Sequence, residues 1–154
     1  MWRNYFLGRE IKVGKNSLQI LAIKRMRDIT IENLHEIGLT RLRSADEPVK
    51  ILSGGERQAL AISRAHYFGG SVLLLDEPTS ALSVKETEKV LEATQKARNS
   101  GMGVVVIDHN IANVHKICDR IVVLEHGRVI KSFCRDDFSV SQVAEMVAGR
   151  HVNL

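Results

Sequence analysis

The chain has 154 residues, of which 44% are hydrophobic and 26% are charged, values typical of a soluble globular protein with one core. Its 22 basic and 18 acidic residues give a net charge of +4 without a long basic cluster, so no nucleic-acid partner is expected. The longest apolar run, around Val104–Ile107, is far shorter than the ~20 residues of a membrane-spanning helix, and residues 1–4 lack a signal-peptide core. Cys118 and Cys134 have no framework spacing, which favours a reduced cytosolic setting.

The first 50 residues are rich in Lys, Arg and Glu and have apolar residues near helical spacing. This pattern predicts a helix that ends at Gly38, where glycine is suited to the C-terminal cap. The apolar positions of this expected helix are Leu18, Ala22, Met26, Ile29, Leu34 and Ile37. A loop with Pro48 follows, and a second helix is expected from Gly54 to about His66, closed by Gly69.

From residue 51 onward, apolar strand-like runs alternate with amphipathic stretches, which is typical of a parallel sheet with covering helices. Val72–Leu75 and Val104–Ile107 are expected to be strands buried on both faces, because their apolar residues are consecutive. An amphipathic helix over Val84–Arg98 is expected between them. The remaining predicted elements are a short helix from Asn110, a hairpin of Arg120–Leu124 and Arg128–Ile130, and a last helix capped by Ser139 or Ser141 that runs to Val147.

The first chemical motif is Leu-Ser-Gly-Gly-Glu-Arg-Gln at residues 52–58. A helix that opens at Ser53-Gly54-Gly55 would present backbone N–H groups and a partial positive charge to a phosphate. The two glycines would let the backbone approach closely, and the Ser53 hydroxyl would add a donor. The alternative is an ordinary capped helix, since Ser53 and Glu56 also have the spacing of a capping box.

The second motif follows the first expected strand. Asp76 and Glu77 come directly after Val72–Leu75, where carboxylates at the end of a strand can hold Mg²⁺ and align an attacking water. His109 occupies the corresponding place after Val104–Ile107, where an imidazole can donate to a phosphate. The remaining histidines are expected to be ordinary surface residues: His35, His66, His115, His126 and His151.

The two motifs, in this order and at this spacing, resemble the ATP-binding cassette (ABC) ATPases, and the match continues through Asp-Glu-Pro-Thr-Ser-Ala-Leu. The resemblance implies an α/β fold: part of a P-loop NTPase fold, with a parallel sheet, flanking helices and a C-terminal hairpin, plus an N-terminal helical subdomain with the signature motif. It implies a helical subdomain over residues 1–70. Residues 71–154 would form the C-terminal half of the ATPase core, with the Walker B, D-loop and H-loop segments.

The resemblance also assigns roles to residues. Asp76 matches the residue that holds Mg²⁺ through water, Glu77 matches the catalytic base, and His109 matches the histidine at the γ-phosphate. The signature motif would bind ATP held by a second cassette in a head-to-tail dimer, through Leu52, Ser53, Gly54, Gly55, Glu56 and Gln58. The loop between the two cassettes would be Ser80, Ala81, Leu82 and Ser83.

Three residues depart from the family pattern. Glu56 replaces the more frequent Gln, and Ser83 replaces an Asp, which weakens the transfer of that Asp's role in coupling the subunits. Asp108 replaces the Ser or Thr that precedes the histidine. A carboxylate near a triphosphate would be repulsive unless it pointed away, so the sequence leaves the local geometry at Asp108 open.

The sequence contains no Gly-x-x-x-x-Gly-Lys-Ser/Thr, so the chain is expected to be the C-terminal portion of an ABC ATPase and inactive by itself. Asn4–Glu10 and Val84–Glu86 resemble segments of importers for ribose- or fructose-like sugars. The implied function is an ATP- and Mg²⁺-dependent subunit, on the cytoplasmic face of the cell membrane, that drives a sugar permease. Two alternatives stay open: a non-transport ABC ATPase that acts on DNA or ribosomes, and a catalytically inactive remnant.

Overall fold

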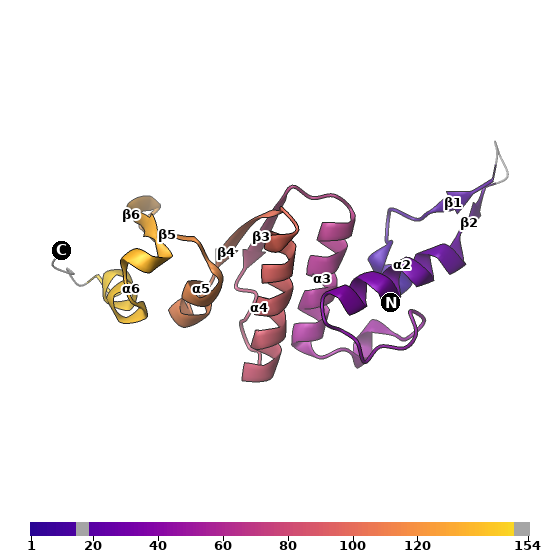
Figure 1. Ribbon diagram of the computed structural model, residues 1–154, viewed down its shortest axis with the longest axis horizontal. Coiled ribbons are helices and arrows are strands. Elements are labelled where there is room, and N and C mark those ends of the chain that lie inside the picture. Colours follow the sequence, from indigo (N-terminus) through magenta and orange to yellow (C-terminus); the bar gives the residue numbers. More distant parts are fainter. Residues whose placement is uncertain (15–18, 150–154) are drawn as a thin grey trace.

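The computed structural model describes residues 1–14 and 19–149. The molecule is elongated, and the chain progresses along its long axis from the N-terminal helices, through α3 and α4, to the C-terminal hairpin (Figure 1). The helices are α1 (Trp2–Tyr5), α2 (Ile23–Glu36), α3 (Gly54–Tyr67), α4 (Val84–Asn99), α5 (Ile111–Ile117) and α6 (Val140–Val147). The strands are β1 (Lys12–Val13), β2 (Ile20–Leu21), β3 (Val72–Asp76), β4 (Gly103–Ile107), β5 (Arg120–Glu125) and β6 (Arg128–Cys134). Two 3₁₀ turns, Val49–Ile51 and Arg135–Asp137, complete the described elements.

The helix predicted to end at Gly38 corresponds to α2, which is shorter than predicted. α2 begins at Ile23, whereas the apolar spacing predicted a helix from Leu18, which lies outside the described residues. The antiparallel pair of β1 and β2 occupies the preceding stretch and extends away from α2 (Figure 1). The end of α2 is as predicted, since Gly38 follows with φ +99°, the left-handed conformation that glycine adopts without strain.

The main core joins α1, α2, α3 and α4. Its fully buried side chains include Tyr5, Phe6, Met26 and Val90, and the rings of Tyr5 and Phe6 contact Tyr67. α3 and α4 have the predicted extents to within a residue and pack along their length (Figure 1). The main core contains residues from both sides of residue 70, and the subdomain boundary expected there stays a prediction.

β3 and β4 form a parallel pair, with Val72 opposite Gly103 and Asp76 opposite Ile107. The prediction that both strands are buried on both faces is wrong, because among the described residues only one face of the pair is covered by helices. Leu73 is 8% exposed on the covered face, whereas Leu74 is 73% exposed on the other. Consecutive apolar residues predicted the strands but not the exposure of their second face.

The C-terminal region has its own small core. β5 and β6 form the predicted antiparallel hairpin around His126-Gly127, and α5 and α6 contact each other beside it. The buried side chains of this second cluster are Ile121, Val123, Phe133 and Val143. Ser139, rather than Ser141, is the N-cap of α6. None of the described helices is long and apolar enough to cross a membrane.

Candidate nucleotide-binding and hydrolysis site

The parallel pairing of β3 and β4 brings Glu77 and His109 together at the carboxyl ends of the two strands. The Glu77 amide donates to the Ile107 carbonyl at 2.7 Å and so extends the strand pairing by one residue. Glu77 Oε1 lies 3.5 Å from His109 Nδ1, and both side chains are more than half exposed. Two groups predicted from separate motifs, 32 positions apart in the sequence, therefore lie within reach of one bound molecule.

The backbone turns sharply after β3. Glu77 and Ala81 have φ values of 44° and 58°, in the left-handed region that costs a non-glycine residue energy. The buried Pro78 and Thr79 lie between them, and the Ser80 amide donates to the Glu77 carbonyl at 3.1 Å. This turn directs the Glu77 carboxylate outward from the strand end, and strained backbone at such a position is frequent in active sites.

The side chain of Asp108 is buried rather than directed to the open side of the site. Its carboxylate is 1% exposed and accepts hydrogen bonds from Thr79 Oγ1 at 2.6 Å and from the Asn110 amide at 2.8 Å. Asn113 Nδ2 also donates to Thr79 Oγ1, at 3.3 Å. Asp108 thus ties the loop after β4, with His109, to the loop after β3, with Glu77. Thr79 and Asn113 could not be assigned to this site from the sequence, although the unusual Asp108 beside His109 was a signal that the carboxylate has a partner.

Asp76 is the last residue of β3 and is exposed. No cluster of three or more His, Cys, Asp or Glu side chains that could hold a metal exists among the described residues. Mg²⁺ needs no such cluster, since it is usually bound through one or two carboxylates, water and substrate phosphates. A single exposed carboxylate at the end of a strand fits that requirement.

The signature motif forms the first turn of α3. Ser53 is the N-cap, and the predicted capping box is present: Glu56 N–H donates to Ser53 Oγ, and Ser53 N–H donates to Glu56 Oε2. Leu52 is buried in the main core, and Gln58 is half-buried on α3. The structure thus confirms the helix start, and the phosphate-binding role of these residues remains a prediction.

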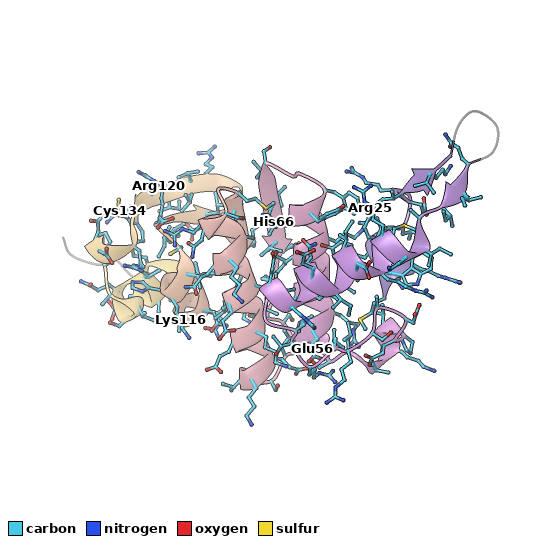
Figure 2. All side chains as sticks on the ribbon, turned by 45° about the vertical axis from the view of Figure 1, so that its right-hand side comes forward. Arg25, Glu56, His66, Lys116, Arg120 and Cys134 are labelled. Carbon is cyan, nitrogen blue, oxygen red and sulfur yellow. The ribbon has the colours of Figure 1, made fainter. Side chains whose placement is uncertain are left out.

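Glu56 (labelled in Figure 2) is buried and ionised. Its carboxylate accepts hydrogen bonds from Arg41 Nε at 2.7 Å and from Lys89 Nζ at 3.0 Å. These bonds, led by the one from Arg41, lower the pKa of Glu56 to about 2. Glu56 therefore connects α3 to α4 and to the loop that follows α2. Arg41 and Lys89 were not found from the sequence, because neither is near Glu56 along the chain.

The two signature glycines lie against the start of α4. A Cβ on Gly54 would lie 2.6 Å from Leu82 Cδ2, and a Cβ on Gly55 would lie 2.6 Å from the Glu86 carbonyl oxygen. The Gly54 amide donates to Glu86 Oε1 at 3.0 Å. The signature helix is thus linked to the loop Ser80–Ser83. Among the described residues, no hydrogen bond or ion pair joins residues 52–58 to Glu77 or His109 directly.

A parallel strand pair that ends in Asp-Glu and Asp-His, beside a helix that opens with Leu-Ser-Gly-Gly-Glu, defines the ABC class of ATPase. The chain belongs to the ABC transporter family, whose family model, described as ABC transporter, matches residues 3–80.

Curated relatives are sugar import proteins. The xylose/arabinose import ATP-binding protein XylG of Sulfolobus acidocaldarius is 37% identical over 96% of this chain and 57% of its own length. The fructose import ATP-binding protein FrcA of Rhizobium meliloti is 37% identical over 95% of this chain and 57% of its own length. The ribose import ATP-binding protein RbsA of Bacillus cereus is 34% identical over 97% of this chain and 29% of its own length. The chain therefore spans little more than half, or less, of these relatives.

Solved structures agree with the fold. The match to MJ1267, an ATP-binding cassette of an ABC transporter, covers 96% of this chain and 55% of the MJ1267 chain. Its TM-score is 0.68 and its sequence identity is 17%, so the likeness is one of fold alone. The ATP-binding cassette MJ0796 was solved in a dimeric post-hydrolysis state bound to ADP and phosphate. The match to it covers 79% of this chain and 51% of the MJ0796 chain, with a TM-score of 0.57 and 29% sequence identity.

Proposed function

We propose that the chain is the catalytic and signature-bearing part of an ATP-hydrolysing subunit that drives import of a monosaccharide. The observation that carries this proposal is the 3.5 Å approach of Glu77 Oε1 to His109 Nδ1 at the adjacent ends of β3 and β4. The names of the relatives, which import xylose or arabinose, fructose and ribose, support a sugar as the transported substrate.

In this proposal Glu77 accepts the proton of the attacking water. The exposed carboxylate projects from a constrained turn, and His109 beside it holds the Glu77 carboxylate and the water in line with the γ-phosphate. Asp108 and Thr79 keep the two loops in register, so that Glu77 and His109 lie at a fixed separation.

Asp76 would hold Mg²⁺ through water, and the ion would supply positive charge against the phosphates when bound. Ser53, Gly54 and Gly55 would donate to the γ-phosphate of an ATP molecule on a second cassette. The absence of a hydrogen bond or ion pair between residues 52–58 and Glu77 or His109 within the described chain fits a site shared by two subunits, as does the dimeric state of MJ0796. The further partners would be membrane permease subunits, which would place the protein at the cytoplasmic face of the membrane.

The test supplies the loop that this sequence lacks. A fusion protein would join a phosphate-loop segment from a relative such as FrcA to the N-terminus of this chain, and phosphate release from MgATP would be measured. Turnover on the order of 1 per second or more is expected from the fusion protein, and none from the chain alone. A fusion protein that folds and binds ATP without hydrolysing it would contradict the proposal, as would turnover by the chain alone.

A further inference from the structure

The carboxylate of Glu86 lies between the N-termini of two helices. Its Oε2 atom accepts hydrogen bonds from the Ser83 amide at 3.0 Å and the Ser83 hydroxyl at 2.8 Å, at the start of α4. Its Oε1 atom accepts from the Gly54 amide at 3.0 Å, at the start of α3. Hydrogen bonds from Ser83, and then from Ser53 and Gly54, lower the pKa of Glu86 to about 2. At neutral pH Glu86 is therefore an anion bound at the start of the signature helix.

A capping box alone does not explain this arrangement. The box at α6 has the same pattern: Ser139 N–H and Oγ–H both donate to Gln142 Oε1 at 2.9 Å, and Gln142 N–H donates back to Ser139 Oγ. One side-chain oxygen is enough there. At α4 the same bonds use only Oε2 of Glu86, and Oε1 is directed to Gly54, 32 residues away in the sequence.

One of the donors that Glu86 engages, the Gly54 amide, is also one that the proposed function gives to a nucleotide phosphate. A helix N-terminus stabilises any anion through its N–H groups and its partial positive charge, and a carboxylate offers the same kind of acceptor oxygens as a phosphate. Gly54, Ser53 and Glu86 are half-buried, so solvent ions can reach this position.

The backbones around this position are too close to rearrange easily. Gly55 packs against the backbone of Glu86 with no room for a Cβ atom, and Gly54 packs against the end of the Leu82 side chain. Rotation of the Glu86 side chain is therefore the simplest way to free the Gly54 amide. That rotation would also break the Oε1 link between the signature helix and the end of the loop Ser80–Ser83.

We propose that the Glu86 carboxylate occupies the phosphate position of the signature motif in the nucleotide-free protein, and that a phosphate must displace it. This inference rests on the proposed phosphate-binding role of Ser53 and Gly54. While Glu86 occupies the site, phosphate cannot bind, so the apparent affinity for phosphate is the intrinsic affinity multiplied by the fraction of time for which the site is free. Occupation for about nine-tenths of the time reduces the affinity about tenfold. Binding of a nucleotide would thus displace Glu86 and break its link to the loop Ser80–Ser83, which is proposed to face the second cassette.

The experiment compares the 154-residue chain with its Glu86→Gln variant, using inorganic pyrophosphate as the probe. The amide resonances of Gly54 and Gly55 are followed by NMR during a pyrophosphate titration. Gln is suited to the capping box, as Gln142 shows, but removes the negative charge at Gly54. The midpoint of the titration is expected to fall by about tenfold or more in Glu86→Gln. Gln142→Glu, the matched change at α6, is expected to leave the midpoint unchanged.

Glu86→Asp separates occupation from simple repulsion, because it keeps the charge and withdraws the carboxylate by one methylene. It is expected to lower the midpoint as Glu86→Gln does, and a midpoint equal to that of the unchanged chain would overturn the inference. If the unchanged chain and Glu86→Gln respond at the same pyrophosphate concentration, the phosphate role stands and the Glu86 inference is wrong. If neither shows a response at Gly54, the phosphate role of the motif fails as well.

Discussion

At the scale of single residues, Glu56 shows how a substitution within a family motif is accommodated. The position more often holds Gln, and the sequence predicted a capping box and, through the family resemblance, a contact of Glu56 with ATP. In the structure the carboxylate is 3% exposed and bound by Arg41 and Lys89, so its charge is compensated inside the protein. A buried carboxylate left without these partners would be strongly destabilising. Glu56 therefore acts as a link between helices.

The depressed pKa of Glu56 predicts a pH-dependent contribution to stability. Because its pKa is about 2 in the folded protein and 4.5 in the unfolded reference, ionised Glu56 stabilises the fold fully above about pH 4.5, and the stabilisation is lost as the pH falls toward about 2. Glu56→Gln is expected to lower the free energy of unfolding at pH 7 by up to about 3 kcal/mol. In urea unfolding, the difference in the free energy of unfolding between the unchanged chain and Glu56→Gln should be smaller at about pH 3 than at about pH 5. An equal difference at both pH values would show that the ion pairs are not its cause.

At the scale of elements, the contact between α3 and α4 was not foreseen. The Gly54-Gly55 pair was interpreted as permitting a close approach to phosphate, and the structure shows that it also permits a close approach of two helices. The same residues thus serve both the packing of α3 on α4 and the proposed anion site. This explains why a displacement at Gly54 would be felt at Leu82 and Glu86.

Gly55→Ala tests this helix contact. Alanine in a helix is normally favoured over glycine by about 1 kcal/mol, but here the new methyl group would collide with the backbone of Glu86. Overpacking of this kind costs about 1–3 kcal/mol, so a net loss of stability is expected. The midpoint of urea unfolding gives the answer, with Ser141→Ala on the exposed start of α6 as the control. A gain in stability would mean that α3 and α4 are not in close contact at this point.

At the scale of the whole molecule, the sequence predicted the order of elements from residue 51 to the end of α6, because the βα alternation and the turn residues are strong local signals. Local signals do not tell what covers a strand, so the burial of Leu74 and Ile107 was predicted wrongly. The pairing of β1 with β2 was missed because the helical spacing extended the predicted helix back from Ala22 to Leu18, over the residues of β2. Pairs distant in sequence, such as Arg41 with Glu56 and Thr79 with Asp108, required the structure.

The proximity of Glu77 and His109 could be predicted from the sequence, whereas their chemical roles stay predictions. The positions of Glu77 and His109 follow from short motifs at the ends of two neighbouring parallel strands, and such ends must lie at one edge of a sheet. The motifs did not predict the features that position these two side chains, which are the strained turn at Glu77 and the Asp108–Thr79 hydrogen bond between the two loops. Glu77 and His109, together with this turn and this hydrogen bond, make up the proposed hydrolytic centre.

The most direct test of that centre is the rate of phosphate release from MgATP by the fusion protein that carries Glu77→Gln. Gln keeps the size of the side chain and its hydrogen bonding but cannot accept the proton of the attacking water, so turnover is expected to fall by about 10²–10⁴-fold while ATP binding is retained. Glu88→Gln, the same change at an exposed position of α4, should leave the rate unaltered. A Glu77→Gln protein that hydrolyses ATP as fast as its parent would contradict the assignment of Glu77 as the catalytic base.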